Sequence, residues 1–130
     1  MVFDSSHVIF ELSPVRILIV EDHEDTRRVL VRLLEHWGFI VASADTLENG
    51  LQILDDQPFD AIVSDIGLPD GTGYALVSEA KRRCQDVIAI ALSGYNSADD
   101  VRIGRLSGFD YHLSKPFDCQ RLRSILSGTA

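Results

Sequence analysis

The stretch AIVSDIGLPDGTGY, residues 61–74, decides the fold because it joins an apolar strand directly to a carboxylate. Its first three residues suit a strand in a protein core, yet the strand pattern ends two residues later on Asp65. The segment LPDG, residues 68–71, comes next as a turn signal. Because burial of an unpaired charge costs free energy, a carboxylate at the end of a core strand requires a partner or a function.

The rest of the chain repeats the same unit of a short apolar strand followed by an amphipathic helix. The other expected strands are residues 15–20, 39–42, 87–92 and 111–113. The expected helices carry apolar residues at helical spacing: Val29, Leu30, Leu33, Leu34 and Trp37; Leu47, Leu51 and Leu54; Tyr74, Val77 and Ala80; a more polar helix at residues 97–106; and Cys119, Leu122, Ile125 and Leu126. Gly38 is expected to end the first helix and Thr46 to cap the second. Alternation of this kind predicts an α/β fold, (βα)5, with a doubly wound parallel five-stranded sheet.

Composition restricts the function further. The chain has 130 residues, enough for one domain, which we place at residues 15–127 between an extension at 1–14 and a tail at 128–130. Twelve basic against 20 acidic residues give a net charge of −8, which argues against a nucleic-acid partner and permits a divalent cation or a basic protein surface as a partner.

Cys84 and Cys119 form no C-x-x-C pair, and we interpret them as reduced thiols with a packing role. With neither a secretory signal nor a run of membrane-spanning length, the chain is expected to be cytoplasmic and without a membrane partner.

Polar side chains come after four of the expected strands. Glu21 and Asp22 come after the first strand, Asp65 ends the third, Ser93 follows the fourth and Lys115 follows the fifth. Taken singly, each has an ordinary interpretation as a helix cap, a turn residue or a solvated charge. Ligands of doubly wound sheets bind at the carboxyl ends of the strands, so we expect all five residues to meet at one edge.

Three carboxylates at one edge repel one another, and one lysine offsets only part of their charge. A hard divalent ion with oxygen ligands supplies the rest, and Mg²⁺ suits sites that combine carboxylates, water and a phosphate. The sequence therefore predicts a metal-assisted phosphate site in which Asp65 is the nucleophile.

Four segments in order, ILIVEDHED, VSDIGLPDGTG, ALSGY and SKPFD, resemble the receiver domain of two-component response regulators, from Val15 to Ser127. The resemblance implies a flavodoxin-like sheet with strand order 2-1-3-4-5 and a signalling domain, not an enzyme acting on a separate substrate. It implies that Asp65 accepts a phosphoryl group. Glu21, Asp22, Asp65 and the backbone carbonyl of Gly67 would bind Mg²⁺ or Mn²⁺.

The resemblance also assigns the residues that handle the phosphoryl group. Ser93 would hydrogen-bond it after transfer, Lys115 would contact one of its oxygens, and the bond to Pro116 is expected to be cis. The family usually has an aromatic switch residue where this chain has His112. Tyr111 should not replace it, because neighbouring strand residues face opposite ways. A switching role for Ser93 and His112 is our hypothesis, and a packed histidine without that role is its alternative.

Two further positions, Gly67 and Tyr95, influence the lifetime of the phosphoryl group in this family. The implied partners are a sensor histidine kinase or a histidine phosphotransfer protein. An output partner or a second copy would use the face formed by the fourth helix, fifth strand and fifth helix. The segment GFDYHLSKP, residues 108–116, resembles receivers fused to sensor kinases, so a free-standing protein and a receiver from a larger chain both stay open.

Three other functions compete with this interpretation. An aspartyl-nucleophile phosphatase commonly needs a second acid near the nucleophile, and Ile66 and Gly67 supply none. A flavodoxin-like nucleotide or flavin protein is disfavoured because GTGYAL lacks a third glycine and follows the third strand instead of the first. A degenerate receiver that only binds proteins is disfavoured by the intact set of acceptor, acidic pair, hydroxyl and lysine.

Overall fold

The computed structural model describes residues 15–94 and 107–128. Its elements, in chain order, are β1 (Arg16–Val20), α2 (Glu24–His36), β2 (Ile40–Ala44), α3 (Leu47–Asp56), β3 (Ala61–Asp65), β4 (Gly67–Leu68), β5 (Gly71–Thr72), α4 (Gly73–Arg83), β6 (Ile88–Ser93), β7 (Tyr111–Ser114) and α6 (Cys119–Ser127). The helix expected at residues 97–106 lies outside the described residues.

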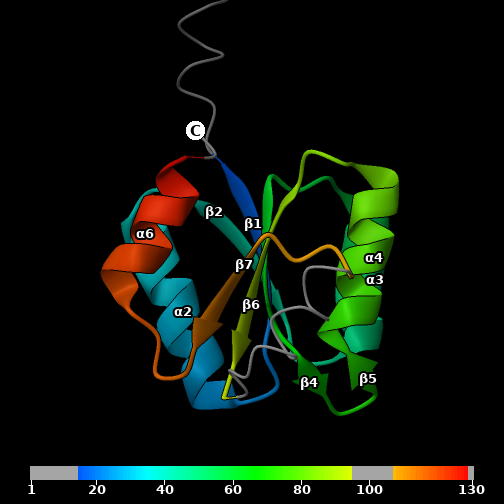
Figure 1. Ribbon diagram of the computed structural model, residues 1–130, viewed down its shortest axis with the longest axis horizontal. Helices are drawn as coiled ribbons and strands as arrows, with labels where there is room; N and C mark the ends of the chain where they lie inside the picture. Colours follow the sequence, from blue (N-terminus) through cyan, green and yellow to red (C-terminus); the bar gives the residue numbers. More distant parts are fainter. Residues whose placement is uncertain (1–14, 95–106, 129–130) are drawn as a thin grey trace, which may run out of the picture.

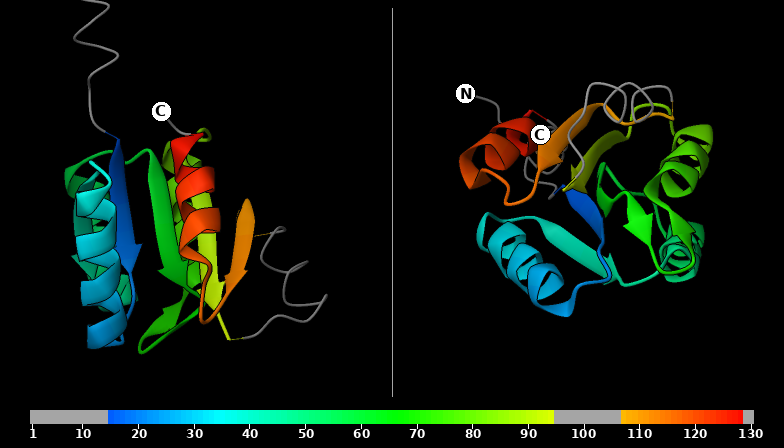
Figure 2. Two further views of the ribbon diagram at one scale, coloured as in Figure 1. Left: turned by 90° about the vertical axis from the view of Figure 1, so that its left-hand side faces the viewer. Right: turned by 60° about the horizontal axis from the view of Figure 1, so that its bottom comes forward.

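The five long strands form one parallel sheet in the order β2-β1-β3-β6-β7. Numbered among themselves, these strands have the expected order 2-1-3-4-5, so the predicted fold class is confirmed. Helices α2 and α6 cover one face of the sheet, and α3 and α4 cover the other (Figure 1). All five strands point the same way, so their carboxyl ends share one edge (Figure 2).

Burial of the central strands explains why they are continuous apolar runs. Residues 17–20 of β1 and 61–64 of β3 have no solvent-exposed surface. Parallel strands covered by helices on both sides meet apolar side chains on each face, so strand residues need not alternate with polar ones. In register, Val20 lies beside Ser64 and Asp65 beside Leu92, which brings the residues at the ends of β1, β3 and β6 to the same place.

Helix α2 differs from its expected packing at one position. Helical spacing groups Val29 with Leu30 and Leu34 on one apolar face, but this is wrong for Val29, which is 59% exposed while the two leucines are fully buried against the sheet. Gly38 ends the helix with a positive φ of 95°, as a glycine allows, and Phe39 N–H donates to the Leu34 carbonyl at 3.1 Å.

The predicted start of the second helix is confirmed, whereas the predicted bounds of the second strand are not. The hydroxyl of Thr46 accepts from the backbone N–H of Asn49, which confirms the predicted cap of α3. Strand β2 begins at Ile40 and ends at Ala44, two residues beyond the expected end. Residues 68–71, expected as a turn, lie within the small antiparallel hairpin β4–β5, which pairs Gly67 with Thr72 and Leu68 with Gly71.

The cysteines do not fill the packing role predicted for them, because both Cys84 and Cys119 are exposed thiols. Among the described residues, no helix is both long enough and apolar enough to cross a membrane.

The contrast between Val29 and Leu30 gives a direct test of the packing. We expect Leu30→Ala to lower the free energy of unfolding by about 2–5 kcal/mol, because it leaves a cavity between α2 and the sheet. The matched control Val29→Ala should change it by no more than about 0.5 kcal/mol. Urea unfolding followed by circular dichroism measures both values, and equal losses would contradict this packing.

Candidate functional site

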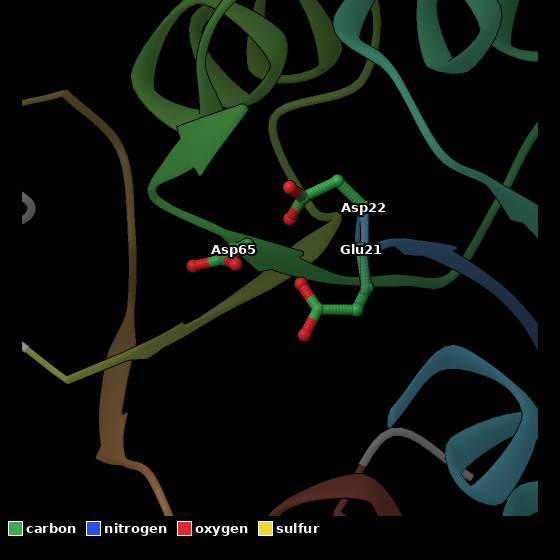
Figure 3. A group of neighbouring side chains, drawn as sticks. All are labelled: Glu21, Asp22 and Asp65. Carbon is green, nitrogen blue, oxygen red and sulfur yellow. The ribbon is translucent and has the colours of Figure 1, made fainter. Parts of the chain in front are cut away.

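Three carboxylates meet at the carboxyl ends of the central strands. Glu21 and Asp22 directly follow β1, and Asp65 is the last residue of β3 (Figure 3). One oxygen from each side chain lies within 4.8 Å of those from the other two. Glu21 is fully buried, Asp65 is half-buried and Asp22 is exposed, so the group is open to solvent on the Asp22 side.

Lys115 reaches this cluster from the segment after β7. Its Nζ donates to Oε1 of Glu21 at 2.7 Å and to Oδ2 of Asp65 at 2.9 Å. Its backbone N–H donates to the carbonyl of Ser93 at 2.9 Å, which ties the lysine to the end of β6. The sequence predicted five polar residues at the ends of four strands. Four of them, Glu21, Asp22, Asp65 and Lys115, form one cluster. Ser93 is linked to this cluster through its backbone carbonyl.

Glu21 has a clearly shifted pKa within this cluster. Burial first, and then the neighbouring Asp65 carboxylate, raise its pKa to about 7, although Lys115 acts in the opposite direction. Burial alone would lower the pKa of Lys115, but its ion pairs with Glu21 and Asp65 outweigh that effect and raise it. The lysine thus stays charged and binds both acids.

The donor set fits a hard divalent cation. Oε2 of Glu21 is buried and has no hydrogen-bond partner among the residues that the structure describes. Three carboxylates carry more negative charge than one lysine offsets, and oxygen donors of this kind are the ligands that Mg²⁺ prefers. Glu21, Asp22 and Asp65 are therefore able to hold such an ion.

Backbone contacts fix Asp65 and the turn behind it. The N–H of Ile66 donates to Oδ1 of Asp65 at 2.9 Å, and the hydroxyl of Ser64 donates to the Asp65 carbonyl at 2.8 Å. Gly73 N–H donates to the Ile66 carbonyl at 2.8 Å. A Cβ on Gly73 would overlap the Asp65 carbonyl, so the start of α4 approaches the acid as only glycine allows.

Sequence reasoning missed the supporting roles of Gly73 and Arg27. The pattern GTG gives no sign from sequence of how close α4 comes to Asp65, and the close approach of Gly73 is the reason for its second glycine. Nη1 of Arg27 donates to the Glu21 carbonyl at 3.0 Å and so holds the end of β1 against α2. No local signal distinguishes this arginine from the others on the same helix.

The remaining predicted residues lie around the cluster. Ser93 is 1% exposed at the end of β6, and Gly67 is an exposed residue that opens β4. His112 is half-buried within β7 beside Ala91, whereas Tyr111 is exposed. The Lys115–Pro116 peptide bond is cis. Tyr95 lies outside the described residues.

Comparison with known proteins identifies the family of the chain. The family model of the response regulator receiver domain matches residues 17–127. The KDP operon transcriptional regulatory protein KdpE of Escherichia coli is 37% identical over 110 residues, which cover 85% of this chain and 48% of KdpE. An uncharacterized 14.6 kDa protein of Leptolyngbya boryana is 33% identical over 109 residues, which cover 82% of this chain and 83% of that protein.

Solved structures show the same fold. The CheY-like receiver domain protein of Methanospirillum hungatei superposes with a TM-score of 0.83 at 28% identity, covering 89% of this chain and 93% of that one. The chain spans about half the length of KdpE and most of the length of the Leptolyngbya protein. The chain therefore belongs to the family of response regulator receiver domains, the phosphorylation-dependent signalling domains of two-component systems.

Proposed function

We propose that this domain accepts a phosphoryl group on Asp65 from a phosphohistidine of a sensor kinase or a histidine phosphotransfer protein, with Mg²⁺ or Mn²⁺ as the cofactor. The observation that carries the proposal is the meeting of Glu21, Asp22 and Asp65 within 4.8 Å, with Lys115 bound to two of them. These are the groups that phosphoryl transfer to a carboxylate needs: a nucleophile, metal ligands and a cation for the transferred oxygens.

In the transfer step, a carboxylate oxygen of Asp65 attacks phosphorus. The new P–O bond forms as the P–N bond breaks, and the electron pair of that bond stays on the imidazole of the donor. Glu21, Asp22, Asp65 and the Gly67 carbonyl would hold Mg²⁺, which would supply positive charge that offsets the phosphoryl oxygens. Lys115 is already beside Asp65 and supplies a second positive charge.

After transfer, the phosphoryl group needs donors that reach its new oxygens. Ser93 follows Leu92, the residue in register with Asp65, so it lies at the same end of the sheet, and we assign this role to its hydroxyl. Movement of Ser93 would reach β7 through the Lys115 N–H to Ser93 carbonyl bond and through the pairing of Ala91 with His112. We infer that this is how the site signals to a partner or second copy docked on the face that includes β7 and α6.

A degenerate receiver and an aspartyl phosphatase remain the alternative functions. A degenerate receiver would have the same fold and would act by binding other proteins. It would not need Lys115 bound to the acidic cluster. A phosphatase would need a second acid beside the nucleophile, where this chain has Ile66 and Gly67. Both alternatives are distinguished by the covalent product.

We expect the protein to gain one phosphoryl group when incubated with Mg²⁺ and phosphoramidate, because the small donor replaces phosphohistidine. Intact mass spectrometry measures the adduct. Asp65→Asn should abolish it, whereas Asp56→Asn, an exposed carboxylate on α3, should retain it. An adduct that survives Asp65→Asn, or continuous hydrolysis of phosphoesters, would contradict the proposal.

Mg²⁺ affinity should weaken as the pH falls through neutrality. Because the pKa of Glu21 is raised to about 7, a proton competes with the metal for this ligand below that pH. We expect about a tenfold weaker affinity at about pH 6 than at about pH 8, measured by isothermal titration calorimetry. Glu21→Gln should bind Mg²⁺ more weakly and with little pH dependence over this range, and an equal pH dependence in that variant would assign the proton elsewhere.

The switching role of His112 predicts a change in its imidazole resonances when the phosphoryl mimic beryllofluoride binds with Mg²⁺. His36, exposed at the end of α2 and away from β7, serves as the internal control and should not shift. Nuclear magnetic resonance measures both. An unmoved His112 in a protein whose Ser93 amide responds would leave His112 as a packed residue without a switching role.

A further inference from the structure

Asp70 caps a helix that is distant from it in the sequence. The backbone N–H of Leu47 donates to its Oδ1 at 2.8 Å, and that of Glu48 donates to its Oδ2 at 2.9 Å. These are the first two residues of α3, whose N–H groups have no acceptor within the helix. Both carboxylate oxygens therefore serve the start of α3, although Asp70 belongs to the β4–β5 segment.

The β4–β5 hairpin carries the chain from Asp65 to α4. It pairs Gly67 with Thr72 and Leu68 with Gly71, and Asp70 lies in the turn between the two strands. Figure 1 shows the hairpin at the edge of the sheet where the strands end. The first residue of the hairpin, Gly67, is the one whose carbonyl the proposed function assigns to the metal.

The same helix start contacts the hairpin at a second point. The side chain of Leu47 lies against Gly71 so closely that a Cβ on Gly71 would overlap it. Leu68 is buried in the core cluster between the sheet and helices α3 and α4, against which Leu47 also packs. The hairpin is thus held between the core and the N-terminus of α3, and Asp70 makes its polar contacts with that helix.

We propose that Asp70 is a positioning residue for the metal site: by joining the turn of the β4–β5 hairpin to the first two N–H groups of α3, it fixes the hairpin that begins at Gly67 and thereby the Gly67 carbonyl. The inference rests on the proposed function, because it concerns a ligand of that same site. Asp70 acts only through the backbone between itself and Gly67. Hydrogen bonds from Glu48 and Leu47 lower the pKa of Asp70, so the carboxylate is the form that makes these contacts near neutral pH.

A matched control exists because α3 has a second cap. The hydroxyl of Thr46 accepts from the Asn49 N–H at 3.1 Å and makes this bond within the helix start itself. Removal of either cap destabilises the N-terminus of α3, but only removal of the Asp70 carboxylate also releases the hairpin. The two substitutions therefore separate helix stability from positioning.

The test compares Asp70→Ala, Asp70→Asn and Thr46→Ala by isothermal titration of Mg²⁺ at a temperature where all are folded. We expect Asp70→Ala to weaken Mg²⁺ affinity by about threefold to tenfold, which is less than the loss seen for direct supports of a metal ligand. Asp70→Asn, which keeps one acceptor oxygen, should fall between this variant and the wild type. Thr46→Ala should bind Mg²⁺ as the wild type does, although its unfolding temperature falls.

Amide hydrogen exchange without Mg²⁺ gives a readout that does not depend on the metal. Asp70→Ala should speed exchange at Leu68 and Gly71, the pair that closes the turn around Asp70, and Thr46→Ala should not. Equal losses of Mg²⁺ affinity in the two variants, or a loosened hairpin with unchanged affinity, would overturn the inference and leave the proposed function standing. A wild-type protein that binds no Mg²⁺ would overturn the proposed function and the inference with it. If Asp70→Ala does not fold, the comparison of Asp70→Asn with Thr46→Ala decides.

Discussion

Repulsion among the carboxylates at the ends of β1 and β3 is the constraint on which the rest of the site depends. Lys115 is the described group that opposes it, and it bridges acids that lie 94 and 50 residues away in the sequence. Only a fold that brings the ends of β1, β3 and β7 together can form these pairs. Burial first, and then the neighbouring Asp65 carboxylate, raise the pKa of Glu21 despite Lys115, and a divalent cation would offset both effects.

The buried parallel sheet makes this concentration of charge tolerable. Residues 17–20 and 61–64 are enclosed on both faces, so the strands that deliver Glu21 and Asp65 are held rigidly by apolar packing. The polar residues then follow at the carboxyl ends of the strands, where the exposed Asp22 opens the cluster to solvent. Their contacts with the backbone, from Ile66 N–H to Asp65 and from Arg27 to the Glu21 carbonyl, fix the acids without adding apolar material near the charge.

The sequence predicted the strands and the acidic cluster well because both leave local signals. Continuous apolar runs predict buried parallel strands, and polar residues directly after them predict a site at the shared edge. Val29 was misplaced because helical spacing does not reveal how wide a stripe the sheet covers, and α2 buries Leu30 and Leu34 but not their neighbour. The cap of α3 by Asp70 was not predictable for a different reason: cap signals are local in sequence, and this acceptor lies beyond the helix and the next strand.

The bonds of Lys115 also determine the consequences of phosphorylation in the proposed mechanism. When Asp65 becomes an acyl phosphate, its Oδ2 no longer carries the charge that attracts the lysine, and the strongest nearby attraction moves to the phosphoryl oxygens. The ammonium group then moves toward that charge, and its bond to Glu21 has to lengthen or reorient. Because the Lys115 N–H is bonded to the Ser93 carbonyl, a shift of the lysine backbone and a shift of Ser93 toward the phosphoryl group are mechanically linked. The ion pairs of Lys115 that stabilise the acidic cluster therefore also couple phosphorylation of Asp65 to the positions of β6 and β7.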